Sequence, residues 1–254
     1  ILHAEKYNVD GKLISRELDG SINSTTYGES IKRSKKLANA LKKLGVNVHD
    51  RVATIAWNNS RHFETYFAVS GMGAILHTLN PRYSPDQLIY ILNHAEDSVL
   101  IVDPTFIPLV ESVQDKLDTV ETIIIASAKD SIPENNLKNV FSYEELLKDE
   151  LDEYNWPQLN EDDAASLCYT SGTTGNPKGV LYSHRSTVLH AISIAGTMGF
   201  ESSSSVLPVV PMFHVNAWGV PYSALITGFT LVLPGHALDG DSLYEMVQKE
   251  SVDC

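Results

Sequence analysis

The sequence predicts an α/β fold in which mainly parallel β-sheets are flanked by helices. Short apolar runs typical of buried strands alternate with segments of helical periodicity, and helix start signals recur between these runs. Strands that are connected through helices pair in parallel, because the crossover returns the chain in the same direction. The apolar fraction of 43% is ordinary for a globular chain and is sufficient for a core.

The predicted helices are located by their N-terminal signals. Thr26 and Glu29 have capping-box spacing, Ser60 is expected to cap a second helix, and Ser84 precedes a proline at the first helical position. Ser142 provides a further start signal. The expected helices cover about residues 26–44, 60–70, from 85, 105–117, from 143, 184–195 and from 241.

The predicted strands are the apolar runs between these helices, and the polar stretch from 127 to 140 is expected to be a loop. The expected strands cover residues 51–57, 74–79, 98–102, 120–126, 164–169 and 179–183. The uncharged run from 202 to 237 contains several prolines, which favour buried strands and turns over a membrane-spanning helix. We expect the part from Val206 to Leu233 to leave apolar surface uncovered.

Composition excludes several classes of function. The net charge of −13 argues against a nucleic-acid partner. The two cysteines, Cys168 and Cys254, are too few for a disulfide framework and are consistent with the reducing cytoplasm, and Cys168 is expected to be a buried strand residue. A polar cluster of His94, Glu96 and Asp97 is expected to end a helix and to face solvent.

The most informative motif lies between the predicted strands at 164–169 and 179–183. It reads Thr170-Ser171-Gly172-Thr173-Thr174-Gly175-Asn176-Pro177-Lys178-Gly179. Glycines let backbone amides approach an anion, hydroxyls donate to its oxygens, and a lysine adds positive charge, so the composition suits a polyphosphate. The spacing is not that of the common P-loop. A flexible surface turn is the alternative, although a turn does not require so many hydroxyls.

This motif resembles the signature loop of the adenylate-forming enzymes, which include acyl-CoA synthetases, luciferases and peptide-synthetase adenylation domains. Three further segments are similar to the medium- and long-chain fatty-acyl-CoA synthetase branch, and the resemblance extends from about Thr26 to the last residue. These segments are residues 78–82, 90–97 and 209–222. The resemblance implies part of a large N-terminal domain, with a first subdomain at about 1–160 and the signature loop and the start of a second subdomain at about 161–254. The family's C-terminal domain is absent from this sequence, so this stretch alone is expected to be inactive.

The resemblance also implies a reaction, in which a fatty-acid carboxylate attacks ATP to give an acyl-adenylate, from which CoA takes the acyl group. The implied requirements are ATP, Mg²⁺ and CoA, and a homodimer is expected by analogy. Alternatives are a CoA ligase for an aryl or short-chain acid and a non-catalytic nucleotide-binding module. The downstream segments that would distinguish these alternatives lie outside the sequence.

The resemblance assigns roles to individual residues. Lys178 and His214 are the candidate catalytic residues, with Lys178 on the β- and γ-phosphates and His214 beside the acyl-adenylate. Thr170 is the candidate Mg²⁺ ligand, and Val215 and Trp218 border the nucleotide and acyl sites. The remaining loop residues implied to contact the phosphates are Ser171, Gly172, Thr173, Thr174 and Gly175. For His214 and Trp218, simple core packing is the alternative interpretation.

Overall fold

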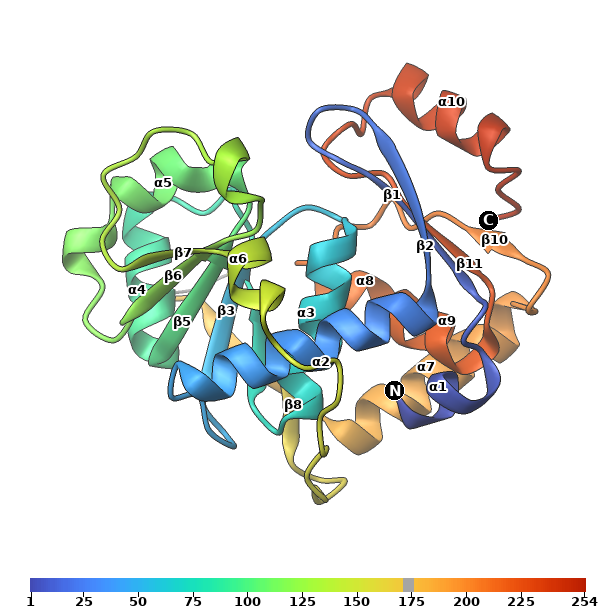
Figure 1. Cartoon of the computed structure of the whole chain (residues 1–254), viewed down its shortest axis with the longest axis horizontal. Helices are drawn as coiled ribbons and strands as arrows, with labels where there is room; N and C mark the ends of the chain where they lie inside the picture. Colours follow the sequence, from blue (N-terminus) through green and yellow to red (C-terminus); the bar gives the residue numbers. More distant parts are fainter. Residues whose placement is uncertain (171–175) are drawn as a thin grey trace.

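The computed structural model describes residues 1–170 and 176–254, and two sheets with surrounding helices make up its framework (Figure 1). The 4-stranded sheet has the order β10 (Ser205–Val206), β11 (Thr230–Leu233), β1 (Lys12–Arg16) and β2 (Ile22–Thr26). The 7-stranded sheet has the order β7 (Val140–Ser142), β6 (Thr122–Ile125), β5 (Asp97–Val102), β3 (Arg51–Ile55), β4 (Ile75–Thr78), β8 (Ala164–Thr170) and β9 (Lys178–Ser183). Only the β1–β2 and β8–β9 pairs are antiparallel among the described strands, which confirms the predicted fold class.

Both sheets take strands from either side of residue 160, the predicted subdomain boundary. β1 and β2 pair with β11, which lies at the other end of the sequence, and β8 and β9 extend the sheet that begins with β3. The division into two subdomains near residue 160 stays a prediction. The strand order indicates that the segments before and after this residue pack against each other.

The helices begin largely where the sequence signals indicate. They are α1 (Leu2–Tyr7), α2 (Tyr27–Lys43), α3 (Ser60–Gly71), α4 (Pro85–Ala95), α5 (Ile107–Glu111), α6 (Tyr143–Lys148), α7 (His184–Met198), α8 (Val215–Trp218), α9 (Val220–Thr227) and α10 (Gly240–Lys249). Thr26 and Ser142 accept the expected backbone hydrogen bonds, and Ser84 forms a complete capping box with Gln87. The N-cap of α3 is Asn59 rather than Ser60, because the Asn59 side chain accepts the amide of His62 at 2.9 Å.

Three other expectations need correction. The helix expected over 105–117 is broken into short pieces, since Pro104 and Pro108 each begin a new turn and cannot donate to a preceding one. The expected loop is followed directly by an unpredicted strand, β7. The uncharged run contains the helix α9 as well as strands and turns, and Pro221 is tolerated in its first turn because the amide there needs no partner.

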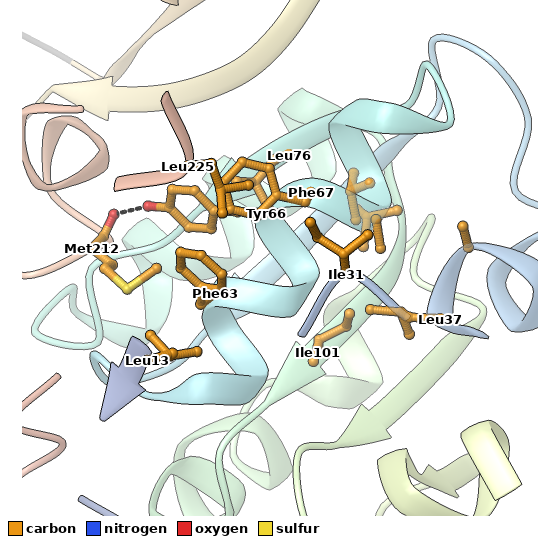
Figure 2. Close-up of a cluster of buried hydrophobic side chains, with 14 of the residues drawn as sticks. Leu13, Ile31, Leu37, Phe63, Tyr66, Phe67, Leu76, Ile101, Met212 and Leu225 are labelled. Atoms are coloured by element: carbon orange, nitrogen blue, oxygen red, sulfur yellow. Dashed lines mark hydrogen bonds between the residues drawn. The ribbon is translucent and has the colours of Figure 1, made fainter. Parts of the chain in front are cut away.

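The main hydrophobic core joins the two sheets through α2 and α3. Figure 2 shows side chains from α2 and α3 packed with side chains from both sheets and from the segment at Met212. Leu13 of β1, Leu76 of β4 and Ile101 of β5 belong to this one cluster and are at most 2% exposed. Burial of these apolar side chains therefore fixes the two sheets relative to each other.

Exposed apolar side chains occur in the expected segment and outside it. Between Val206 and Leu233 the apolar strand residues are buried, because β11 pairs on both sides, whereas Val209, Val215 and Trp218 are exposed. Large exposed apolar side chains also gather on β9 and α7, at Leu181, Val188, Leu189 and Ile192. In the described part of the chain, no helix combines the length and apolar character needed to cross a bilayer.

Candidate functional site

The two ends of the signature loop are adjacent in the larger sheet. Thr170 is the last residue of β8 and Lys178 the first of β9, and their Cα atoms are paired in the antiparallel register. The Thr170 hydroxyl donates to the Lys178 carbonyl at 3.5 Å, and both residues are exposed. The structure thus brings together the predicted metal ligand and the predicted phosphate-binding lysine. Ser171, Gly172, Thr173, Thr174 and Gly175 lie outside the described residues, and their roles stay predictions.

The residue before the loop is held by polar contacts. The Tyr169 hydroxyl lies 2.6 Å from Nδ1 of His94, and the Tyr169 carbonyl accepts the Tyr83 hydroxyl at 3.0 Å. Partial burial raises the pKa of Tyr169 to about 12, so its hydroxyl keeps its proton at neutral pH. Side chains from α4 and the preceding turn therefore fix the point at which β8 enters the loop.

A buried pair of His77 and Asp97 supports the same strand. His77 Nδ1 lies 2.7 Å from Asp97 Oδ2, both side chains are fully buried, and the His77 ring is 5.2 Å from the Tyr169 ring. Burial raises the pKa of Asp97, and the neighbouring His77 opposes that shift. The expectation that Asp97 faces solvent is wrong, because this residue begins β5 and its side chain turns into the sheet. Glu96 and His94 are exposed as expected.

The second motif presents His214 at the surface. The backbone before it is anchored, since Tyr66 donates its hydroxyl to the Met212 carbonyl (Figure 2) and Thr78 donates to the Phe213 carbonyl at 3.3 Å. The His214 amide donates to Pro211 at 2.9 Å, while its side chain is exposed. Core packing is therefore not the role of His214.

A left-handed turn follows His214. Val215, Asn216, Ala217 and Trp218 have φ values of 47°, 51°, 48° and 54°, and Gly219 continues with 76°. This region of backbone space is unfavourable for residues with a Cβ, and most of all for a β-branched residue such as valine. Trp218 is 56% exposed, so it is not a core residue either.

A cavity of about 260 Å³ lies between this turn, β9 and α7. Its walls are formed by Tyr182, Ser186, Thr187, His190, Val215, Asn216, Gly219 and Tyr222. Among the described residues, the buried hydroxyls of Thr187 and Tyr222 have no hydrogen-bond partner. The cavity thus combines apolar walls with polar groups, as small-molecule sites commonly do.

Asn58, in the turn between β3 and α3, ties the His214 segment to the larger sheet. Its amide donates to the carbonyls of Pro208 and Val210 at 3.0 and 3.1 Å, and its oxygen accepts the Met212 amide at 2.6 Å. Sequence reasoning missed Asn58 because its partners lie about 150 residues away. No local pattern indicates such a contact.

A larger cavity of about 800 Å³ lies at the junction of the two sheets, lined by residues that include Arg61 and Asp103. Arg61 is paired with Glu17 and Glu144 at 2.7 and 2.8 Å, so its charge is already neutralised within the protein. The smaller cavity adjoins the His214 turn and β9, which begins at Lys178. We therefore take the smaller cavity, together with the loop ends, as the candidate site.

Known proteins resemble this chain over nearly its whole length. A family model described as "AMP-binding enzyme" matches residues 3–254. The medium-chain-fatty-acid–CoA ligase of Ectopseudomonas oleovorans is 48% identical over 252 residues, with 98% of this chain and 46% of that protein covered. The 3-methylmercaptopropionyl-CoA ligase of Ruegeria lacuscaerulensis is 44% identical over 252 residues, with 98% and 47% covered.

A solved structure supports the fold. The inhibitor-bound N-terminal domain of FACL13 from Mycobacterium tuberculosis matches with a TM-score of 0.85 at 24% identity, over 99% of this chain and 60% of that one. The chain spans about half the length of the curated relatives it matches.

Proposed function

We propose, on the premise that this chain belongs to the AMP-binding enzyme family, that its protein is a fatty acid–CoA ligase. It would activate a medium- or long-chain fatty acid with ATP and then transfer the acyl group to CoA. The observation that carries this proposal is the packing of the two motif segments. β8, which enters the signature loop, lies directly against the turn after His214, with Ser166 and Asn216 hydrogen-bonded at 2.8 Å. A phosphate site and an acyl site that meet at one place suit a reaction that joins a carboxylate to a nucleotide.

The first step would be attack of the carboxylate oxygen on the α-phosphorus, with pyrophosphate leaving in line. A carboxylate is ionised at neutral pH, so this step needs no general base. Catalysis then depends on positioning the reactants and on neutralising phosphate charge. Lys178 is suited to the second task, because it is an exposed lysine at the end of the loop, paired in register with Thr170.

The acyl chain would lie on the side of the loop occupied by His214 and Val215. Val215 lines the 260 Å³ cavity, and His214 precedes it at the surface. The anchored backbone at Met212 and Phe213 fixes the point at which the exposed His214 side chain leaves the main chain. This arrangement would let His214 contact the carboxylate or the acyl-adenylate while the chain extends into the cavity.

Mg²⁺ would supply charge neutralisation on the phosphate oxygens when it is bound. The described residues contain no group of three or more His, Cys, Asp or Glu side chains that could hold a metal ion. Thr170 offers one oxygen ligand, which fits an ion that usually keeps several waters and takes other ligands from substrate phosphates. The donor set of this chain is therefore compatible with Mg²⁺ held mainly by the nucleotide.

A ligase for a smaller functionalised acid is the second candidate. The cavity of about 260 Å³ is small, and its lining includes the polar side chains of Ser186, Thr187 and His190, which suits a short functionalised acid. The similarity to a ligase for 3-methylmercaptopropionate points in the same direction. We further propose a cytoplasmic location, in keeping with the free cysteines, and a homodimer by analogy with the family.

The proposal is tested with the full open reading frame that encodes this chain. The purified protein is incubated with ATP, Mg²⁺, CoA and saturated acids from butyrate to palmitate, with 3-methylmercaptopropionate as a further arm. We expect acid-dependent pyrophosphate release and the matching acyl-CoA by mass spectrometry, highest with medium or long chains. A maximum at the thioether acid would favour the second candidate, and nucleotide binding without pyrophosphate release would leave only a binding module.

A further inference from the structure

The left-handed turn from Val215 to Trp218 needs an explanation, because its backbone is unfavourable without support. Consecutive residues with positive φ are rare in proteins, and only Asn216 is of a type that tolerates this conformation well. Such strain persists only where surrounding contacts determine the conformation, and it is concentrated at functional sites. The question is therefore which contacts hold this turn.

The side chain of Asn216 makes the principal contacts. Its Nδ2 donates to the Ser166 hydroxyl at 2.8 Å, and its Oδ1 accepts from the Tyr66 hydroxyl at 3.4 Å and from the Cys168 thiol at 3.6 Å. Ser166 and Tyr66 are fully buried, and Asn216 and Cys168 are each 6% exposed. Burial raises the pKa of the Cys168 thiol, so the thiol remains a donor at neutral pH.

These contacts join two parts of the candidate site. Ser166 and Cys168 lie on β8, a few residues before Thr170, and Asn216 lies in the turn that carries Trp218 and lines the cavity. Tyr66 also donates to the Met212 carbonyl (Figure 2), so its hydroxyl contacts the chain on both sides of His214. The network is buried, and loss of one member leaves a polar group unpaired away from water.

We infer that Asn216 is a positioning residue. Its hydrogen bond to Ser166, which we call the latch, fixes the left-handed turn to β8 and so keeps the acyl side of the site aligned with the signature loop. The expected effect on the acid rests on the proposed function, whereas the latch itself rests on the geometry alone. Releasing the latch frees the turn to relax toward ordinary backbone angles. Val215 then leaves the cavity wall, and the acid is no longer aligned with the nucleotide.

The test uses the full open reading frame and three variants. Ser166→Ala removes the latch partner without touching the turn or the cavity, and Asn216→Gly removes the latch while keeping a residue that accepts positive φ. Ser34→Ala is the matched control, because Ser34 is 1% exposed and its hydroxyl donates to two carbonyls within α2 and α3, away from the site. Each protein is measured for melting temperature, for kcat and for the KM of the acid and of ATP. Hydrogen exchange over residues 212–222 is followed by mass spectrometry.

The latch predicts a specific pattern. In Ser166→Ala, exchange over 212–222 becomes at least tenfold faster, and kcat/KM for the acid falls about tenfold or more while the KM for ATP changes less than twofold. In the Asn216→Gly background, Ser166→Ala has little further effect, because the two residues act through one contact. Ser34→Ala lowers the melting temperature without either change.

Two results would overturn the inference: exchange over 212–222 in Ser166→Ala equal to that in Ser34→Ala, or fully additive effects of Ser166→Ala and Asn216→Gly. Failure of the proposed function is seen separately, as a wild-type protein that releases no pyrophosphate with any acid. In that case the hydrogen-exchange measurement still tests whether Asn216 holds the turn through Ser166.

Discussion

Replacing Lys178 with alanine is expected to separate activity from stability. Lys178 is exposed at the first position of β9, which is the edge strand of the larger sheet. Exposed substitutions away from special backbone positions usually change the free energy of unfolding by no more than about 0.5 kcal/mol. Loss of one fixed charge-assisted contact to developing phosphate charge costs about 2.7–4 kcal/mol, or a factor of roughly 10²–10³ in kcat. The effect on the reaction should therefore exceed the effect on folding several-fold.

The assay compares acid-dependent pyrophosphate release with the melting temperature in the full open reading frame. Lys12→Ala is the matched control, because Lys12 is also an exposed lysine at the first position of a strand, β1. We expect Lys12→Ala to keep the wild-type rate and Lys178→Ala to lose nearly all of it at an unchanged melting temperature. Wild-type pyrophosphate release by Lys178→Ala would refute the assignment of the loop as a phosphate site. Equal losses in both variants would show that the charge acts at long range rather than by contact.

Three further outcomes are expected. Trp218→Ala should change the free energy of unfolding by less than about 1 kcal/mol, because the side chain is 56% exposed. The same variant should alter the chain-length profile of acid activation, and an unchanged profile would exclude Trp218 from the acyl site. Burial raises the pKa of Asp103 from 3.8 to about 7, so between these pH values the folded protein holds a proton that the unfolded chain has lost. The free energy of unfolding should therefore fall by up to about 4 kcal/mol as the pH rises from about 4 to 7. In urea titrations, Asp103→Asn should lose this pH dependence. Asp97→Ala should lower the free energy of unfolding, measured in urea, by about 3–5 kcal/mol. Asp97→Ala combined with His77→Leu should lower it by less, because no buried partner is then left unpaired. A larger loss in the double variant would contradict this account.

Local signals in the sequence predicted much of the fold. The caps at Thr26, Ser84 and Ser142 were confirmed because a cap depends on residues within one helical turn. Asn59 and Ser60 are both good capping residues, and the choice between them depends on a distant contact, since the Ser60 amide donates to the Ser15 hydroxyl. The pairing of β1 with β11 across the chain was likewise beyond local pattern.

The candidate site was predictable in part. The sequence motifs predicted Thr170 and Lys178 as site residues, and the structure pairs them across two strands, while their roles stay predictions. The left-handed turn at Val215 was not predictable, because valine carries no preference for positive φ and only tertiary contacts impose it. The buried pairing of His77 with Asp97 was missed for the same reason, because each residue reads as a surface polar group until its partner is known.

The central claim is that a carboxylate oxygen attacks the α-phosphorus of ATP at the site formed by the signature loop and the His214 turn. The most direct measurement supplies the full-length protein with octanoate labelled with ¹⁸O in both carboxylate oxygens, together with ATP, Mg²⁺ and CoA, and analyses the nucleotide product by mass spectrometry. The account predicts AMP that carries one ¹⁸O atom, because the attacking oxygen stays on phosphorus when CoA takes the acyl group. Unlabelled AMP, or ADP with labelled inorganic phosphate, would contradict it.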